Sequence, residues 1–186
     1  MARSSAGFSL TELTTTLAVI GIISAALIAV MNNLNQQSER MNTQTDLLVA
    51  GNQIFKLIEP WAALAGDKQG AAALTQADAL VITGGAEVRF CYDLDGTDRV
   101  VRQFRVTDKR LQTRTKVDAA CTPDSGSDGW ENLTEQVIRS ISFTSGTGSS
   151  YSLDVVANLE RIVPGTDETV GLRMRKRLNL YSMTRY

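Results

Sequence analysis

The chain has 186 residues, of which 43% are hydrophobic and 21% charged, with a net charge of −1 and no histidine. This length and apolar content are sufficient for one folded domain with its own core. The balanced charge argues against nucleic-acid binding over the whole surface, and the lack of histidine removes the commonest general base and zinc ligand. The sequence has no nucleophile elbow, phosphate loop or dinucleotide fingerprint, so we expect neither an enzyme nor a bound cofactor.

The first 31 residues predict a membrane anchor. Nineteen uncharged residues run from Leu13 to Met31. As a helix they would measure about 28 Å at ~1.5 Å per residue, close to the ~30 Å thickness of the bilayer hydrocarbon core. Residues 1–7 carry Arg3 and no acid, so the positive-inside rule keeps them cytoplasmic and places the rest of the chain across the membrane. The segment 8–31 is the predicted transmembrane helix.

Glu12 lies one residue before this uncharged run. A carboxylate inside a membrane segment costs about 2.5–3.5 kcal/mol, so such a group is expected to have a cationic partner. The alternative is that Glu12 lies among the lipid headgroups, where its charge costs little. If the chain were cut after Gly7, the new amine of Phe8 would lie four residues before Glu12 and on the same helical face.

The basic leader, Gly7, Phe8, Glu12 and the apolar helix together resemble the class III signal peptide of type IV pilins and pseudopilins, the subunits of type IV filaments. The resemblance implies cleavage between Gly7 and Phe8 by a membrane aspartic prepilin peptidase. It also implies N-methylation of Phe8 and pairing of Glu12 with the terminal amine of a neighbouring subunit. A general secretory signal, cut near Ala29 to release a soluble protein, is the competing interpretation.

Residues 32–61 are predicted to continue the helix as an amphipathic spine for the folded domain. Pro60 should kink or end this helix near Glu59, because proline lacks an N–H group and clashes with the preceding turn. A homotypic coiled coil is the alternative use of the same apolar face. The predicted stripe consists of Leu34, Met41, Leu48 and Phe55, flanked by Leu47, Ile54 and Trp61, with Gly51 and Ile58 adding to it.

Residues 62–186 are predicted to form an extracytoplasmic domain. A connector rich in alanine and glycine comes first, with one short helix over residues 71–77. The expected fold class is α+β, in which a long N-terminal helix, both membrane anchor and spine, packs on a mostly antiparallel β-sheet. This is the pilin fold that the resemblance implies. Alternating apolar residues predict strands over 88–92, 99–106, 111–117, 151–159 and 170–180, and residues 130–143 predict a turn of helix followed by a strand.

A second resemblance concerns the type of subunit. The sequence Trp130-Glu-Asn-Leu, followed by Val137, Ile141 and Phe143, is similar to J-type pseudopilins of type II secretion and to W-type minor pilins. Ala29 stands where major pilins carry a helix-breaking proline, although Gly21 matches their glycine. Together with a sheet of four or five strands and long loops, this implies a low-copy minor subunit near the filament tip.

Cys91 and Cys121 are predicted to form a disulfide. They lie 30 positions apart in the part of the chain expected to face an oxidising compartment. The alternative is two buried thiols. Closing a loop of this length contributes roughly 3–4 kcal/mol on the chain-entropy model.

Two charged clusters are candidate binding sites. Arg173, Arg175 and Arg177 share one face of the last strand. With Lys176, and with Arg114 and Lys116 of another strand, they would form a basic patch for an acidic partner or for DNA phosphates; the alternative is a solvated outer face. Around Gly96, the carboxylates of Asp93, Asp95 and Asp98 are a calcium candidate, but their spacing differs from an EF-hand. We expect a tight hairpin turn there and no metal.

These features together predict a structural minor pilin or pseudopilin, incorporated near the tip of a type IV pilus or type II secretion pseudopilus. The expected partners are other pilin or pseudopilin subunits, the prepilin peptidase, the inner-membrane assembly platform and the membrane. The expected location is the bacterial inner membrane, with a cytoplasmic N-terminus and a periplasmic domain, followed by the filament. The alternative is a binding module on the same anchor, such as an adhesin or a DNA-uptake receptor.

Overall fold

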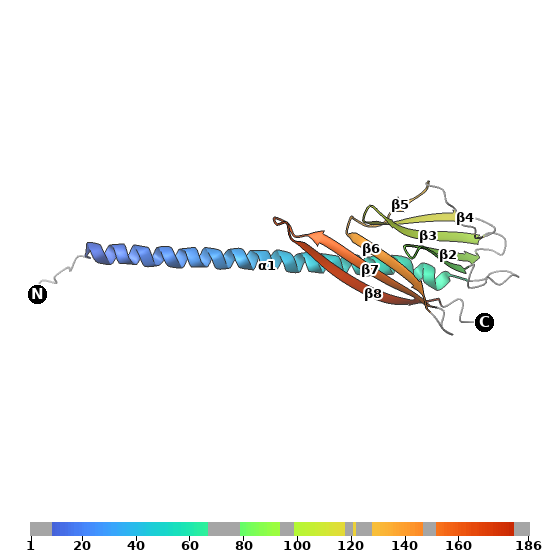
Figure 1. Ribbon diagram of the computed structural model, residues 1–186, viewed down its shortest axis with the longest axis horizontal. Helices are drawn as coiled ribbons and strands as arrows, with labels where there is room; N and C mark the ends of the chain where they lie inside the picture. Colours follow the sequence, from blue (N-terminus) through green and yellow to red (C-terminus); the bar gives the residue numbers. More distant parts are fainter. Residues whose placement is uncertain are drawn as a thin grey trace, which may run out of the picture. The chain divides into compact units, whose positions relative to one another are not determined.

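One long helix and eight strands make up the described part of the chain. The computed structural model describes residues 9–66, 79–93, 99–117, 121, 128–146 and 152–180 (Figure 1). The predicted α+β class is confirmed, because the helix packs on antiparallel sheets. The elements in chain order are α1 (Leu10–Leu64), β1 (Leu80–Thr83), β2 (Glu87–Asp93), β3 (Arg99–Thr107), β4 (Arg110–Val117), β5 (Glu131–Asn132), β6 (Ile138–Ser145), β7 (Ser152–Ile162) and β8 (Thr169–Asn179).

The chain divides into two compact units, residues 1–42 and 43–186. In the first unit, every side chain from residue 9 to residue 42 is exposed. This part of α1 contains a stretch that is long and apolar enough to cross a membrane. Leucine, isoleucine and valine side chains exposed in such a run require lipid or protein around them. The feature is compatible with a single-pass membrane anchor.

In the second unit, α1 turns a narrow apolar stripe toward the sheets. The helical spacing of three or four residues is as predicted, but the heptad series is wrong as the centre of the stripe, because Met41 and Leu48 are exposed. Leu47 to Val49 are all apolar, so the sequence alone does not fix which of them faces inward. Gly51 lies so close to β7 and β8 that an added Cβ would overlap the Sδ atom of Met174. The buried residues of α1 are Thr43, Leu47, Gly51, Ile54, Phe55, Ile58 and Ala62.

Of the predicted kink or end near Glu59, an end of the helix there is wrong. Pro60 lies inside α1, which continues to Leu64. A proline within a helix costs ~3 kcal/mol through its missing hydrogen bond and its clash with the preceding turn. Ile58 and Ala62 on either side of it are fully buried in the domain core, and this burial holds the last turn in place. Tertiary packing therefore outweighs the local preference.

The first sheet has the order β1-β2-β3-β4-β5, and each neighbouring pair is antiparallel. The predicted strands over residues 88–92, 99–106 and 111–117 are confirmed by β2, β3 and β4. Phe90 and Phe104 are fully buried, and their rings meet edge to face with centroids 6.0 Å apart. β1 lies outside the predicted strands because four residues are too few to establish an alternating pattern.

The second sheet has the order β6-β7-β8, and the strand arrangement corrects two expectations. A single sheet of four or five strands is wrong, since the described strands form two sheets. The helical turn expected after Trp130 is wrong as well, because β5 pairs with β4. The N–H of Leu133 donates to the carbonyl of Leu111 at 2.8 Å, so the backbone groups of this segment are satisfied by a strand instead of a helix.

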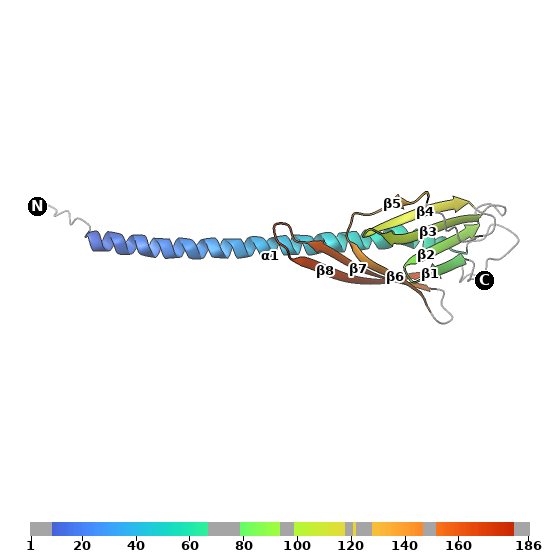
Figure 2. The same cartoon turned by 45° about the horizontal axis from the view of Figure 1, so that its top comes forward.

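Two backbone hydrogen bonds join the sheets along β6. The N–H of Phe143 donates to the carbonyl of Gly85 in the β1–β2 turn at 2.7 Å, and the N–H of Ile138 donates to the carbonyl of Lys109 in the β3–β4 turn at 2.9 Å. Figure 2, turned from the view of Figure 1, again shows both sheets beside the C-terminal part of α1. Side chains from this part of α1 and from both sheets form one hydrophobic core.

Candidate functional site

The start of α1 carries the candidate assembly residue Glu12. Ser9 lies directly before the helix, and its backbone N–H donates to Oε2 of Glu12 at 3.1 Å. This is one half of a capping box, in which an acid at the third helical position binds the N–H of the cap residue. Gly7 and Phe8, the predicted cleavage and methylation residues, lie outside the described residues. Glu12 thus caps the N-terminus of α1. The three-residue spacing between Ser9 and Glu12 in the sequence would have indicated this capping role.

Threonines fill the next turn without leaving their hydroxyl groups unpaired. The hydroxyl of Thr14 donates to the carbonyl of Thr11 at 3.0 Å, and that of Thr16 donates to the carbonyl of Glu12 at 2.7 Å. Thr15 donates to both of these carbonyls at 3.0 Å. A polar group that is satisfied within its own helix is less costly in lipid than an unpaired one. The threonines are therefore compatible with an anchor that begins close to Glu12.

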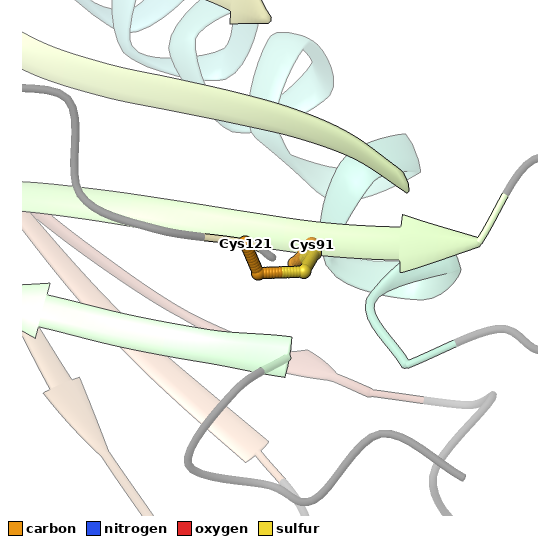
Figure 3. Close-up of a disulfide and its surroundings, with 2 residues drawn as sticks. All are labelled: Cys91 and Cys121. Atoms are coloured by element: carbon orange, nitrogen blue, oxygen red, sulfur yellow. A yellow bond between two sulfur atoms is a disulfide. The ribbon is translucent and has the colours of Figure 1, made fainter. Parts of the chain in front are cut away.

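The predicted disulfide between Cys91 and Cys121 is confirmed (Figure 3). Cys91 comes from β2 and Cys121 from the segment after β4, with Cα atoms 6.0 Å apart. Both residues are buried together with Val101 of β3. The cross-link therefore fixes the chain after β4 to the face of the first sheet that points away from the main core.

Removal of the disulfide is expected to lower the free energy of unfolding of the domain by about 3–4 kcal/mol, because it frees a 30-residue loop in the unfolded chain. The double substitution Cys91→Ala and Cys121→Ala avoids a single free thiol. Denaturant unfolding of the full chain in detergent micelles measures the change. Reductant should destabilise the wild type by a similar amount and leave the variant unaffected, whereas equal midpoints for all samples would contradict the prediction.

The predicted arginine face of β8 is present, but two of its charges are already paired. Arg175 and Arg177 both donate to the carboxylate of Asp154 on β7, at 2.9 Å for the closest contacts. Lys176 points to the other side and pairs with Glu59 of α1 at 2.8 Å. Arg173 is exposed. The outer face of β8 is therefore a solvated surface whose charges are partly paired within the domain. This agrees with the alternative to a binding patch, a solvated outer face of the strand.

The two arginines lower the pKa of Asp154 from 3.8 to about 2, chiefly through the hydrogen bond from Arg177 and next through that from Arg175. The stabilisation from this shift is fully present above pH ~4 and is lost as the pH falls to about 2. The reason is that the carboxyl group of Asp154 takes up its proton at a higher pH in the unfolded chain than in the folded protein. Because both arginines are more than 60% exposed, we expect these ion pairs to contribute about 1 kcal/mol to the free energy of unfolding. The free energies of unfolding of the wild type and of Asp154→Asn should converge as the pH falls from 5 to 2. A difference between the two free energies that stays constant over this range would contradict the prediction.

Arg114 and Lys116 do not extend this patch. They belong to β4 of the first sheet, whereas β8 belongs to the second. Arg114 is buried and donates to Oε1 of Gln103 on β3, at 2.9 Å from Nε and 2.6 Å from Nη2. The sequence shows the charges but not the sheet to which each strand belongs, so the suggested extension of the patch to Arg114 and Lys116 is not supported.

Of the three carboxylates of the calcium candidate, Asp93 lies within the described residues. Asp93 is buried at the end of β2, opposite Arg99 of β3 in the register of the hairpin. Asp95 and Asp98 lie outside the described residues. Within the described ranges, no group of three or more histidine, cysteine, aspartate or glutamate side chains is placed to hold a metal ion.

Several arginines of the first sheet have roles that sequence reasoning missed. Arg102 lies over the ring of Trp61 with Cζ 4.9 Å from the centroid, and Arg105 lies 3.8 Å from that of Trp130. Arg89 is buried, and its Nε and Nη1 atoms have no hydrogen-bond partner among the described residues. This burial lowers the pKa of Arg89, and Glu87 only partly opposes the shift. The alternating pattern places Arg89 and Arg105 on the face away from the core and Arg102 on the same face as Phe104, but it does not reveal which rings or side chains cover them.

The described residues thus offer the start of α1, the disulfide and the charged face of β8 as candidate functional features. Only the first combines an unusual residue with an unusual setting, a carboxylate at the beginning of an exposed apolar helix. No protein-family model, curated protein or solved structure matches the chain.

Proposed function

We propose that the protein is a structural subunit of a type IV filament, a minor pilin or pseudopilin that works by assembly and not by turnover. The observation that carries the proposal is the construction of α1. One continuous helix of 55 residues is exposed and apolar in its first part and is built into a folded core in its last part. A subunit that must leave the membrane and bury its anchor among other anchors needs such an element.

The proposed mechanism uses Glu12 to set the position of one subunit against the next. Cleavage between Gly7 and Phe8 would create an amine that needs an anion in an apolar surrounding. The carboxylate of Glu12 already reaches back toward the start of the helix, as its hydrogen bond with Ser9 demonstrates. In the filament, this carboxylate would neutralise the terminal amine of a neighbouring subunit. The amine of Phe8 would also be N-methylated.

The proposed setting follows from the same anchor. The chain would reside in the bacterial inner membrane with its sheets in the periplasm, and would then enter the filament near the tip. Its partners would be the prepilin peptidase, the assembly platform and other pilin or pseudopilin subunits. The resemblance of residues 130–143 to J-type and W-type subunits supports a minor rather than a major role.

Mass spectrometry of the N-terminal peptide tests the proposal. The full chain is co-expressed with a prepilin peptidase or with its catalytically inactive variant. A peptide that begins at Phe8, with or without a methyl group, and is absent with the inactive peptidase would support processing as a filament subunit. An intact leader, or a cut near Ala29, would overturn it and return the chain to the anchored or secreted class.

The alternative of a DNA-uptake receptor loses its main support in the domain. Arg175 and Arg177 are hydrogen-bonded to Asp154, and Lys176 is paired with Glu59. Phosphate groups would have to compete with carboxylates already in place. A structural role is therefore favoured over DNA binding.

A further inference from the structure

We propose that Met174 is a site of oxidative modification, at which a peroxide converts the thioether into a sulfoxide and thereby loosens the contact between β8 and α1. Met174 lies on the inner face of β8, where it is half-buried and packs against the domain core. β8 is the outermost of the described strands of the second sheet, so this side chain lies at the border of the core. Gly51, its neighbour on α1, belongs to the same unit 43–186.

The thioether of Met174 fills a notch that Gly51 leaves in the surface of α1. A Cβ atom at position 51 would overlap the Sδ atom of Met174 and would lie 3.3 Å from its Cε atom. The same Cβ atom would lie 3.0 Å from Cδ1 of Leu159 on β7. Because protein interiors are close-packed, the side of the sulfur that faces α1 has no room for another heavy atom. The contact therefore requires a residue without a side chain at position 51 and a slim, unbranched side chain at position 174.

The surroundings of this thioether are apolar. Ala157 lies opposite Met174 in the register of β7 and β8 and is fully buried, and Leu159 is buried as well. Neither side chain has a hydrogen-bond donor for a sulfoxide oxygen. A polar group held there without a partner is unfavourable, so the oxidised side chain must turn toward solvent and leave the notch. β8 then loses its contact with Gly51.

The modification requires only a peroxide as co-reactant. A lone pair of the sulfur attacks one oxygen of the peroxide, the S–O bond forms as the O–O bond breaks, and the other oxygen leaves as water after it is protonated. The sulfur is oxidised by two electrons and the peroxide is reduced. Methionine sulfoxide reductases reverse this change. The disulfide between Cys91 and Cys121 indicates that the domain folds in an oxidising compartment, where such damage is expected.

The chain provides an internal control for the effect of position. Met41 lies in the unit 1–42 and is 67% exposed. Every described side chain of that unit is exposed, so oxidation of Met41 breaks no packed contact. Both methionines are expected to react, but the stability of the domain should depend on the state of Met174 alone.

The test treats the full chain, in detergent micelles, with hydrogen peroxide. Peptide mass spectrometry measures the sulfoxide content at Met41 and Met174, and tryptophan fluorescence in a urea titration measures unfolding. We expect the equilibrium constant for unfolding to rise about tenfold or more when Met174 is oxidised, and a methionine sulfoxide reductase to restore it. Met174→Leu, which nearly conserves the volume, should keep its midpoint after peroxide treatment. Met41→Leu should lose stability as the wild type does.

Gly51→Ala tests the notch itself. The added methyl group displaces the flexible end of Met174 and exposes its sulfur. Met174 is therefore expected to be oxidised several-fold faster in this variant, whereas the rate at Met41 should not change. Oxidation should also cause a smaller further loss of stability than in the wild type, because the contact that it breaks is already weakened. Equal oxidation rates at Met174 in the variant and the wild type would contradict the proposed contact.

Two other outcomes would overturn the proposal. One is a Met174 that stays reduced in the wild type while Met41 is fully oxidised. The other is complete oxidation of Met174 without a change in the unfolding midpoint. If Met174→Leu did not fold, time courses on the wild type and on Met41→Leu would still decide, since the loss of stability must follow the sulfoxide content at Met174. The assay uses neither leader cleavage nor assembly, so its failure would not bear on the proposed filament function.

Discussion

Replacement of Glu12 by alanine is expected to abolish incorporation of the protein into filaments. Without the carboxylate, the terminal amine of a neighbouring subunit would lie unpaired among apolar helices, at a cost of about 2.5–3.5 kcal/mol. This corresponds to a loss on the order of a hundredfold in the equilibrium for insertion. Immunoblots of sheared filaments and of membranes, taken from cells that carry the remaining assembly machinery, measure the partition of the protein.

The stability of the folded domain should not change in Glu12→Ala. Glu12 lies in the first unit, and its described side-chain hydrogen bond joins it to Ser9 of the same helix end. The melting temperature of the domain is therefore expected to stay the same, and loss of the cap should be confined to the first turn. Glu39→Ala, which removes an acid beyond the apolar run of the same helix, is the matched control and should assemble normally. Normal assembly of Glu12→Ala would refute the pairing mechanism.

Phe104→Ala is expected to lower the free energy of unfolding of the domain by about 3–5 kcal/mol. The side chain is fully buried in β3, and its removal loses both the transfer free energy of the ring and its packing against Phe90. Since domains are usually stable by only about 5–15 kcal/mol, the variant should unfold at a much lower denaturant concentration. Tryptophan fluorescence in a urea titration measures the midpoint.

Val117→Ala provides the control for this experiment. It also removes apolar atoms from the first sheet, but Val117 at the end of β4 is 58% exposed. We expect a change within about 0.5 kcal/mol, as for other surface substitutions. A loss below about 1 kcal/mol in Phe104→Ala would mean that the centre of the first sheet is not part of the stability-determining core.

The sequence allowed prediction of the features that depend on local pattern. The uncharged run after Glu12 indicated the exposed part of α1, and the alternation around Val88, Phe90 and Tyr92 indicated β2. The pairing of Cys91 with Cys121 followed from their number and expected compartment. Each of these inferences needed only neighbouring residues or a simple count.

The features that depend on distant contacts could not be predicted in the same way. Three adjacent apolar residues, Leu47 to Val49, left open which face of α1 is buried, and the sheets select Leu47. Pro60 is tolerated because residues far along the chain cover the helix around it. The division into two sheets, and with it the separation of Arg114 from Arg175, results from strand pairings that have no local signal.

The position of β8 gives its charges a protective function. It is the outermost strand in the order β6-β7-β8 of the described strands, and it is eleven residues long. An exposed strand of this length offers a row of backbone groups on which a strand of another molecule could pair, which leads to aggregation. The five consecutive exposed or half-exposed positions 173–177 include Arg173, Arg175, Lys176 and Arg177, and charged side chains along an edge strand discourage its pairing with a strand of another molecule. The charged side chains of β8 are thus expected to disfavour edge-to-edge association of this sheet.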